Sequence, residues 1–246
     1  MIRVFLTTID STEDVIQKAI SFLNGEELRR FSLIKTTNRS LQFLYGRVLV
    51  KTCLQRHFKL LPTQYVITAL ADHKPQILPA SLEKGTDKMT KKTTLFPEIS
   101  ISHSGSHIVC ALSTDGPIGI DIEQVKERSN LARLAQRVLA PAEKKVFRQL
   151  AKNEQHRYFY EHWTLKEAYY KAKGASVSNF SRLNFVAVKN RQFKLANQSD
   201  SRWQFFSFDL ENSIVGAIAL HAPKPIRTPA ITYLTTVMPA KVEIQE

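Results

Sequence analysis

The sequence predicts an α+β protein, and three observations support that class. Apolar residues recur at three-and-four spacing between Asn38 and Leu60, which is the period of an amphipathic helix. Strand-like runs that alternate apolar and polar residues fill the chain between Phe96 and Val125. The chain has 246 residues, of which 43% are hydrophobic, so it can bury a sizeable core. We therefore expect either one large domain or two small ones that share an interface.

The first part of the chain is predicted to be one strand followed by three helices. Met1 to Thr8 alternates like a strand, and Ser11 to Asp14 then supplies capping residues for a helix that runs to Leu23. A second helix is expected from about Glu26, before the long helix over Asn38 to Leu60. The stretch from Leu78 to Thr94 is rich in lysine and threonine and has no period, which favours an exposed loop.

The second part is predicted to be a hairpin, three helices and further antiparallel strands. Two strand-like runs, His107 to Thr114 and Ile118 to Val125, are joined by Asp-Gly-Pro, which predicts the hairpin. A strand that ends at Ser102 precedes it. Helices are expected over Leu131–Val138, Pro141–Leu150 and Asn153–Lys173, the last ended by Gly174. Strands are expected over Leu183–Val188, Trp203–Asp209 and Ile214–His221, with a peripheral, proline-rich end.

Charge and cysteine content limit the function classes. Lys and Arg total 35 against 22 Asp and Glu, so the net charge of +13 favours an anionic partner. Cys53 and Cys110 lie in apolar runs and are expected to be small buried hydrophobes, which fits a reducing compartment. Nowhere do eighteen apolar residues run together, so we expect a cytoplasmic protein with no membrane partner.

Three carboxylates are the first candidates for chemistry. In GIDIE the strand period of two puts Asp121 and Glu123 on one face, a pair that taken alone is more often a solvated surface. In WTLKEAYYKAKG, Glu167 shares a helix face with Trp163 and Lys171. An ordinary ion pair between Glu167 and Lys171 accounts for the lysine but not for the carboxylates in GIDIE. Three carboxylates brought together would repel one another unless a divalent cation joined them. Oxygen ligands with lysines nearby suit Mg²⁺ carrying a diphosphate, so the pattern predicts a phosphate-bearing substrate.

The motif ISHSG, residues 101 to 105, precedes the expected hairpin. It reads either as a turn with ordinary hydrogen bonds or as a set of donors for phosphate. The sequence contains no Walker A loop, G-x-G-x-x-G fingerprint, H-E-x-x-H, C-x-x-C or G-x-S-x-G elbow. The common nucleotide-binding, zinc-protease, redox and hydrolase classes therefore lack support.

The ordered set ISHS, GIDIE and W-x-x-KEA-x-x-K-x-x-G, with HKP upstream, resembles the 4'-phosphopantetheinyl transferases of the Sfp type. The resemblance spans about Glu26 to Leu220. It implies two pseudo-twofold-related α/β halves, residues 1–114 and 115–222, with coenzyme A and Mg²⁺ in the cleft between them and a C-terminal extension over 223–246. It also implies the reaction, in which phosphopantetheine moves from coenzyme A to a serine of a carrier protein and adenosine 3',5'-bisphosphate is released.

The resemblance also implies roles for individual residues around the diphosphate. Asp121, Glu123 and Glu167 would be the magnesium ligands. Lys166 and Lys171 would neutralise the phosphates of the coenzyme. Glu167, or a water on the metal, would take the proton of the attacking serine, so Glu167, Lys166 and Lys171 form the expected catalytic set.

The nucleotide end of the coenzyme is expected to meet Lys74 of HKP, Ser102 and His103, and a basic cluster that includes Arg29. The family commonly has an arginine for the nucleotide's phosphate at the position of Gln42. Arg39, one helical turn earlier, is the expected substitute.

The expected partner is an apo acyl or peptidyl carrier protein of acidic character, and the enzyme is expected to be a monomer. Two alternatives stay open from the residues alone. A Mg²⁺-dependent nuclease would also use carboxylates, a lysine and a basic chain, although its usual Asp/Glu-x-Lys order differs from the order of Lys166 and Glu167. A basic nucleic-acid-binding module would use the lysine-rich loop for phosphate contacts.

Overall fold

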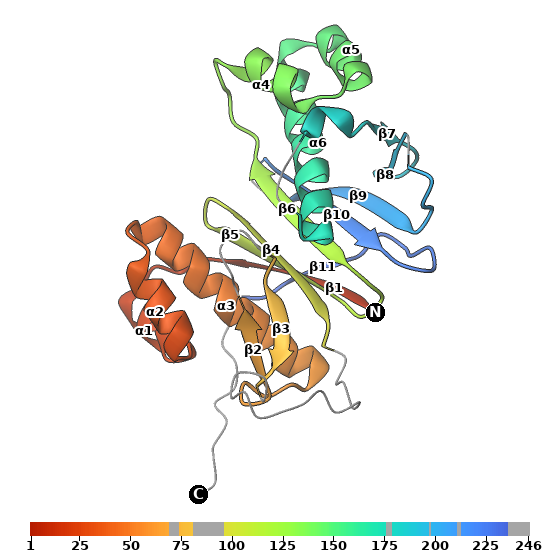
Figure 1. Cartoon of the computed structure of the whole chain (residues 1–246). Coiled ribbons are helices and arrows are strands. Elements are labelled where there is room, and N and C mark those ends of the chain that lie inside the picture. Colours follow the sequence, from red (N-terminus) through yellow and green to blue (C-terminus); the bar gives the residue numbers. More distant parts are fainter. Residues whose placement is uncertain (69–73, 81–95, 176–178, 197, 211–212, 236–246) are drawn as a thin grey trace, which may run out of the picture.

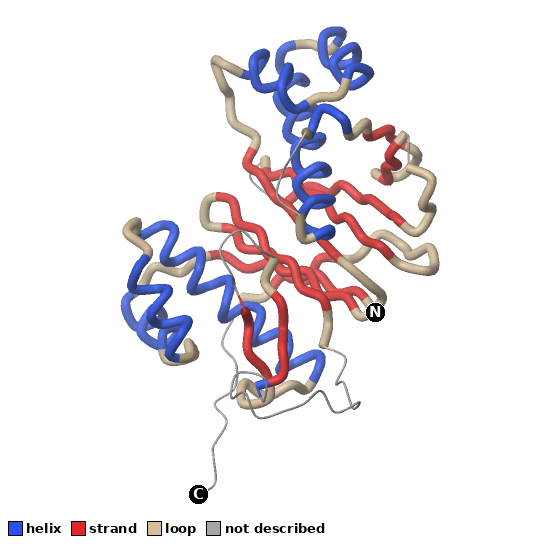
Figure 2. The backbone as a smooth tube through the Cα atoms, in the orientation of Figure 1, coloured by secondary structure: helices blue, strands red, loops and turns tan. Residues whose placement is uncertain are grey.

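The computed structural model describes residues 1–246 except 69–73, 81–95, 176–178, 197, 211–212 and 236–246. Two sheets lie next to each other, and each carries one long helix on its face (Figures 1 and 2). These helices, α3 and α6, are both 22 residues long. The predicted α+β class is confirmed, and the two halves repeat one arrangement of helix on sheet.

The first half contains a sheet in the order β11-β1-β5-β4 and a separate two-stranded ladder, β2-β3. Helix α3 packs on this sheet, and the buried residues between them form the core of the half. Its elements are β1 (Ile2–Thr8), α1 (Glu13–Ile20), α2 (Gly25–Leu33), α3 (Thr37–Phe58), β2 (Tyr65–Thr68), β3 (Gln76–Pro79), β4 (Glu98–Ser104) and β5 (His107–Ser113).

The second half contains a sheet in the order β6-β10-β9-β8-β7, on which α6 packs, and α4 and α5 lie at the far end of α6 (Figure 1). Gly174 ends α6 with a φ of 61°, the left-handed conformation that favours glycine. The elements are β6 (Ile118–Gln124), α4 (Leu131–Val138), α5 (Pro141–Gln149), α6 (Lys152–Lys173), the 3₁₀ helix η2 (Phe180–Arg182), β7 (Phe185–Ala187), β8 (Gln192–Leu195), β9 (Trp203–Leu210), β10 (Ile214–His221) and β11 (Ile231–Tyr233).

The hairpin predicted at Asp-Gly-Pro is wrong. The tight turn lies between β4 and β5, where Gly105 has a φ of 58° and Ser104 pairs with His107. Strand β6 pairs with β10 instead of β5, so residues 114–117 cross from one sheet to the other. At Gly116, with a φ of 145°, a Cβ would lie 2.1 Å from the His221 carbonyl oxygen. That close approach leaves room only for glycine at the crossing.

Other differences concern short elements and the end of the chain. The expected loop over 78–94 begins inside β3, and residues 81–94 lie outside the described part of the chain. Strand β11 pairs parallel with β1, and Leu234 donates its N–H to the Leu6 carbonyl at 2.8 Å. The C-terminal segment therefore returns to the sheet of the first half. In the described residues, no helix is both long and apolar enough to cross a membrane.

A ladder of serines joins the two halves. The hydroxyl oxygens of Ser100, Ser102 and Ser104 on β4 accept hydrogen bonds of 3.0, 3.3 and 2.9 Å from backbone N–H groups of β6. These N–H groups point away from β10, so the serines take the place of a neighbouring strand. The donors, in the same order, are Ile120, Ile122 and Gln124. This ladder fixes the position of β6 along β4.

Candidate functional site

The candidate carboxylates lie where β4, β6 and α6 meet. Ser102 donates to Asp121 Oδ1 at 2.8 Å, and Lys171 Nζ donates to the same oxygen at 2.7 Å. Ser104 lies 3.5 Å from Glu123 Oε2, so both acidic side chains of β6 point toward β4. Glu167 projects from α6, one turn before Lys171, and the charges of Asp121 and Glu123 act on its carboxyl group. The structure therefore brings the three carboxylates and Lys171 together.

The ionisation of these groups reflects their crowding. Burial, followed by the charges of Asp121 and Glu123, raises the pKa of Glu167 to about 7, and Lys171 acts in the opposite direction. Burial, followed by the Asp121 charge, also raises the pKa of Glu123. The charge of Asp121 therefore makes ionisation of both Glu123 and Glu167 harder, as expected for neighbouring anions.

One buried carboxylate oxygen of the site has no hydrogen-bond partner. Asp121 is 5% exposed, and its Oδ2 atom has no hydrogen-bond partner. Such an atom is costly unless a donor or a cation meets it. Within the described residues, no three His, Cys, Asp or Glu side chains form a ready set of metal ligands. The donors present fit Mg²⁺, which keeps several waters and takes other ligands from substrate phosphates.

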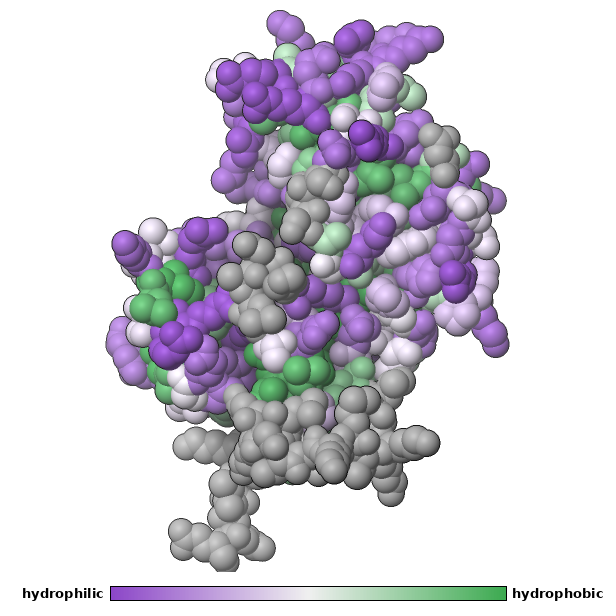
Figure 3. Space-filling model, viewed as in Figure 1, coloured by the Kyte–Doolittle hydropathy of each residue, from purple (hydrophilic) through white to green (hydrophobic). Residues whose placement is uncertain are grey.

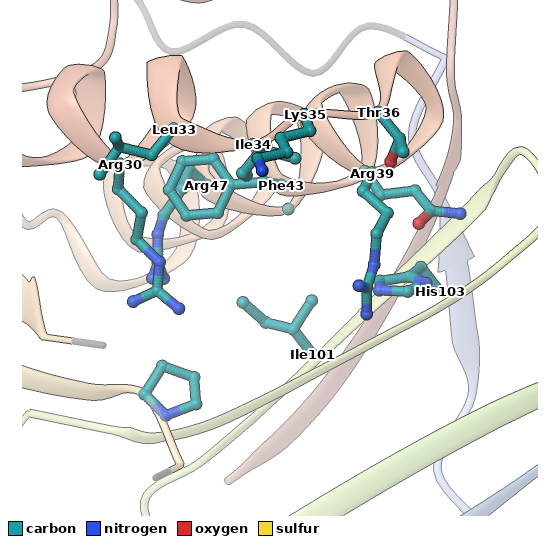
Figure 4. A pocket seen from close by; sticks show the side chains of 13 residues that line it. Arg30, Leu33, Ile34, Lys35, Thr36, Arg39, Phe43, Arg47, Ile101 and His103 are labelled. Carbon is teal, nitrogen blue, oxygen red and sulfur yellow. The ribbon is translucent and has the colours of Figure 1, made fainter. Parts of the chain in front are cut away.

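A cavity of about 700 Å³ opens between α3 and β4 (Figure 4). Arg39 and His103 lie together on one side, Ile101 forms part of the floor, and Phe43 lies on the other side. The full lining is Arg30, Leu33, Ile34, Lys35, Thr36, Arg39, Gln42, Phe43, Gly46, Arg47, Pro75, Ile101 and His103. It contains several cations and, among these residues, no acidic side chain, so it suits an anion with an apolar portion.

Charges from the cavity and from the carboxylate cluster act on the same residue, His103. Desolvation of the His103 ring, followed by the Lys171 ammonium group, lowers the pKa of His103, while Asp121 acts in the opposite direction. Arg39 adds a further lowering effect from the cavity side. His103 thus lies between the cationic cavity and the carboxylate cluster, and it is neutral at pH 7.

Three of the residues expected at the nucleotide end lie outside this cavity. Ser102 is buried in the junction between β4 and β6, where its hydroxyl serves Asp121 and the β6 backbone. Lys74 pairs with Glu98 at 2.6 Å, next to the end of α6. Arg29 is exposed and pairs with Glu26 at 2.6 Å, whereas its neighbour Arg30 lines the cavity.

Lys166 does not reach the carboxylates, which corrects the role predicted for it. Its ammonium group is fully buried, 2.5 Å from Glu143 Oε2 and 2.8 Å from the Val138 carbonyl oxygen. Consecutive residues on a helix point about 100° apart, so Lys166 and Glu167 face different neighbours. Glu143 also accepts hydrogen bonds from the N–H groups of Ala140 and Phe185. The pair joins α4, α5, α6 and β7.

Comparison with known proteins places this site in a family. Residues 117–219, which contain Asp121, Glu123 and Glu167, match the model of the 4'-phosphopantetheinyl transferase superfamily. The 4'-phosphopantetheinyl transferase HetI of Nostoc is 26% identical over 212 residues, which cover 86% of this chain and 84% of HetI. The chain belongs to the 4'-phosphopantetheinyl transferase superfamily. It is an enzyme of the transferase class.

Two further relatives agree with the family. The 4'-phosphopantetheinyl transferase Sfp of Bacillus subtilis is 30% identical over 167 residues, which cover 66% of this chain and 65% of Sfp. AcpT of Escherichia coli K12, another 4'-phosphopantetheinyl transferase, is 33% identical over 110 residues, which cover 44% of this chain and 55% of AcpT. The nuclease and nucleic-acid-binding alternatives gain no support from these comparisons.

The transferase fold buries two cations of the long helix α3. Arg47 is 5% exposed, and its guanidinium lies 5.1 Å from the centroid of the Phe43 ring. Burial lowers the pKa of Arg47 to about 10, against the opposing effect of Glu27. Lys51 is also buried and lies 2.5 Å from Glu27. Periodicity could not find this group, because its acidic partner lies on another helix.

Glu167 gives the metal-free transferase a pH-dependent stability. A carboxyl whose folded pKa is raised from 4.5 to about 7 stabilises the fold when protonated. That contribution is fully present below about pH 4.5 and is lost as the pH rises through 7. In EDTA, we expect Glu167→Gln to melt a few degrees above the wild type at pH 8 and at the same temperature at pH 4.5. The exposed control Glu127→Gln should melt with the wild type at both pH values, and equal melting of Glu167→Gln and wild type at pH 8 would contradict the assignment.

The buried Glu143–Lys166 pair should contribute strongly to stability. We expect Glu143→Ala to lower the free energy of unfolding by about 3 to 5 kcal/mol, because it leaves the Lys166 charge buried and unpaired. Glu154 is a matched control, since it accepts from the N-cap residue of α6 as Glu143 does from that of α5, but in an exposed setting. Glu154→Ala should cost about 1 kcal/mol. Urea unfolding measures the free energy of unfolding of both variants. Similar losses of stability in the two would show that the buried ion pair contributes little.

Proposed function

We propose that the cavity between α3 and β4, together with the carboxylates of β6 and α6, is the active site of a 4'-phosphopantetheinyl transfer. The reaction moves phosphopantetheine from coenzyme A to a serine of an apo acyl or peptidyl carrier protein and releases adenosine 3',5'-bisphosphate. One observation carries this proposal. A cationic cavity, His103, Lys171 and a carboxylate cluster are neighbours in space, and the cluster contains a buried oxygen without a hydrogen-bond partner. A diphosphate bound there would meet cations on both sides.

The nucleotide part of coenzyme A would occupy the cavity. Arg39 and Arg30 would attract its phosphates, and neutral His103 would donate a hydrogen bond. Phe43 and Ile101 would contact the apolar faces of the adenosine. Glycine at position 46, beside Ile101, leaves this wall without a further side chain.

The carboxylates would hold the metal. Asp121, Glu123 and Glu167 are the candidate ligands, and the free Oδ2 of Asp121 is the oxygen that most needs a cation. Bound Mg²⁺ would neutralise the diphosphate and stabilise the charge that develops on the leaving phosphate. Lys171 is 31% exposed and lies between Asp121 and His103, so it can also reach a phosphate oxygen. Lys171 would stabilise the developing negative charge directly, and the three carboxylates would do so only through the metal that they hold.

In the chemical step, the hydroxyl oxygen of the carrier serine attacks the phosphorus on the pantetheine side. A new bond forms between that oxygen and phosphorus, and the bond from phosphorus to the bridging oxygen of the diphosphate breaks. Glu167, or a water at the metal site, is the candidate acceptor of the serine proton. The bridging oxygen leaves as part of adenosine 3',5'-bisphosphate.

One incubation tests the function. The protein is mixed with coenzyme A, Mg²⁺ and a panel of apo carrier proteins, and each carrier is weighed by mass spectrometry. We expect a gain of one phosphopantetheine group on at least one carrier and an equal amount of adenosine 3',5'-bisphosphate. If no carrier gains the group while added DNA or RNA is cut, the nuclease alternative holds instead.

Arg39 should replace the arginine that the family commonly has at the position of Gln42. Gln42 is 7% exposed and donates its amide to the Gly105 carbonyl at 3.0 Å, so it is engaged within the fold. We expect Arg39→Ala to reduce the preference for coenzyme A over 3'-dephospho-coenzyme A about tenfold, the effect of losing roughly 1.4 kcal/mol. Arg29→Ala is the control, because Arg29 lies outside the cavity lining. An unchanged preference in Arg39→Ala would remove this residue from the role.

The remaining expectations complete this proposal. The crossing from β5 to β6 supports the proposed division into residues 1–114 and 115–222, and β11 would belong to the proposed extension over 223–246. The net charge of +13 suits an acidic carrier protein. The enzyme would act as a monomer in the cytoplasm.

A further inference from the structure

Arg128 follows β6 and is held by α6 in two ways. Its backbone N–H donates to His156 Nε2 at 3.1 Å, and its side-chain Nε donates to the Tyr160 hydroxyl at 2.6 Å. The Arg128 guanidinium carbon also lies 5.8 Å from the centroid of the Tyr160 ring. An exposed arginine ordinarily keeps most of its rotamer freedom, which it must lose on binding a ligand. At Arg128 much of that entropy cost is already met by the fold.

The held guanidinium has no acidic partner within the described part of the chain. No carboxylate of these residues lies within 4.0 Å of it, and its single hydrogen-bonded side-chain nitrogen is Nε. Glu123 is close enough for the two charges to influence each other, although they form no ion pair. The outer nitrogens of an exposed and oriented cation are therefore available to an anion from outside.

The order of groups across the site indicates which anion this is. The cavity lies between α3 and β4, whereas Tyr160 holds Arg128 against α6, about two helical turns before Glu167. The cationic cavity is thus at one end of the carboxylate cluster, and Arg128 is at the other. With the nucleotide in the cavity, the pantetheine arm and the incoming carrier serine lie toward Arg128.

The surroundings of Arg128 are basic and exposed. Lys126, Arg133 and Arg137 lie on the same segment or on α4, and these exposed cations outnumber the one exposed acid there, Glu127. Figure 3 shows hydrophilic side chains over the α4 and α5 end of the molecule. An exposed basic rim suits the surface of an acidic protein. It suits a phosphate group less well, because a phosphate would bind in an enclosed site among half-buried groups.

We propose that Arg128 is a carrier-positioning residue, whose outer N–H groups bind an acidic side chain of the carrier protein close to the serine that is modified. This inference rests on the proposed function. Arg128 would orient the serine without touching the reacting atoms, and a planar guanidinium can bind one carboxylate through two parallel hydrogen bonds.

The test measures KM for the carrier at saturating coenzyme A, KM for coenzyme A at saturating carrier, and kcat. We expect Arg128→Ala to raise the carrier KM about tenfold, with KM for coenzyme A changed less than twofold. Arg128→Lys should recover only part of the loss, since lysine cannot bind through two N–H groups. Tyr160→Phe, which removes the anchor, should raise the carrier KM by a smaller factor.

The matched control is Arg227→Ala, another exposed arginine, which precedes β11 at the opposite edge of the first sheet. It removes the same charge and should leave all three constants within twofold of the wild type. A rise in the coenzyme A KM of Arg128→Ala without a rise in the carrier KM would overturn the proposal, and so would equal carrier KM values for the two variants. Failure of the proposed function itself is distinct, because the wild type would then modify no carrier.

Discussion

Replacing Glu123 with alanine is expected to lower kcat/KM for phosphopantetheine transfer by about 100-fold or more, comparable to the loss of a major electrostatic stabiliser. Asp121→Ala and Glu167→Ala should have effects of the same order, since the three carboxylates act on one metal. The fold should survive each change, because the carboxylates repel one another when no cation is present. Rates of carrier modification followed by mass spectrometry provide the measurement.

Glu127→Ala is the control for these variants, because it removes an exposed acid four residues after Glu123. It should retain activity within about twofold of the wild type. Thermal unfolding of all four variants separates loss of the site from loss of the fold. Near wild-type turnover of Glu123→Ala at low Mg²⁺ would show that the three carboxylates do not share a metal.

Gly119→Ala is expected to be strongly destabilising. A Cβ at this position would lie 1.9 Å from the Ala168 carbonyl oxygen and 2.5 Å from the Ala172 nitrogen, both in the backbone of α6. Neither atom can move without displacing the helix that carries Glu167 and Lys171. We expect a loss of at least about 3 kcal/mol, the upper end of the usual cost of overpacking. Any protein that folds should transfer slowly, because α6 would lie farther from Asp121.

Gly25→Ala is the matched control for this substitution. A Cβ at Gly25, the first residue of α2, would have no heavy atom within 4 Å. Alanine has the higher helix propensity, so this variant should be as stable as the wild type or slightly more stable. Urea unfolding compares the two variants, and equal stability would contradict the close packing of β6 on α6.

Local pattern predicted much of this structure. The period over Asn38 to Leu60 corresponds to α3, and the capping signals before Glu13 and at Pro141 correspond to helix starts. Alternation in GIDIE put Asp121 and Glu123 on one face, and the helix period put Glu167 and Lys171 together. These features depend on neighbours in the sequence, so the sequence alone is sufficient for them.

Pairing between distant segments was the part that could not be predicted. Nothing within Asp-Gly-Pro indicates that β6 pairs with β10 rather than β5, because strand pairing depends on the whole sheet. The partner of Lys166 is 23 residues away and becomes visible only once α5 packs on α6. The family resemblance assigned Ser102 to the nucleotide, but its position in the serine ladder depends on how the halves meet.

The most direct test of the central claim, that the carboxylates of β6 and α6 join Mg²⁺ to the diphosphate of coenzyme A, is the affinity for coenzyme A with and without Mg²⁺. Isothermal titration provides this value for the wild type and for Glu123→Ala, independently of turnover. In the wild type we expect Mg²⁺ to tighten binding about tenfold or more, equivalent to roughly 1.4 kcal/mol. In Glu123→Ala this gain should largely disappear. An equal gain from Mg²⁺ in both proteins would contradict the claim, since the metal would then act without these carboxylates.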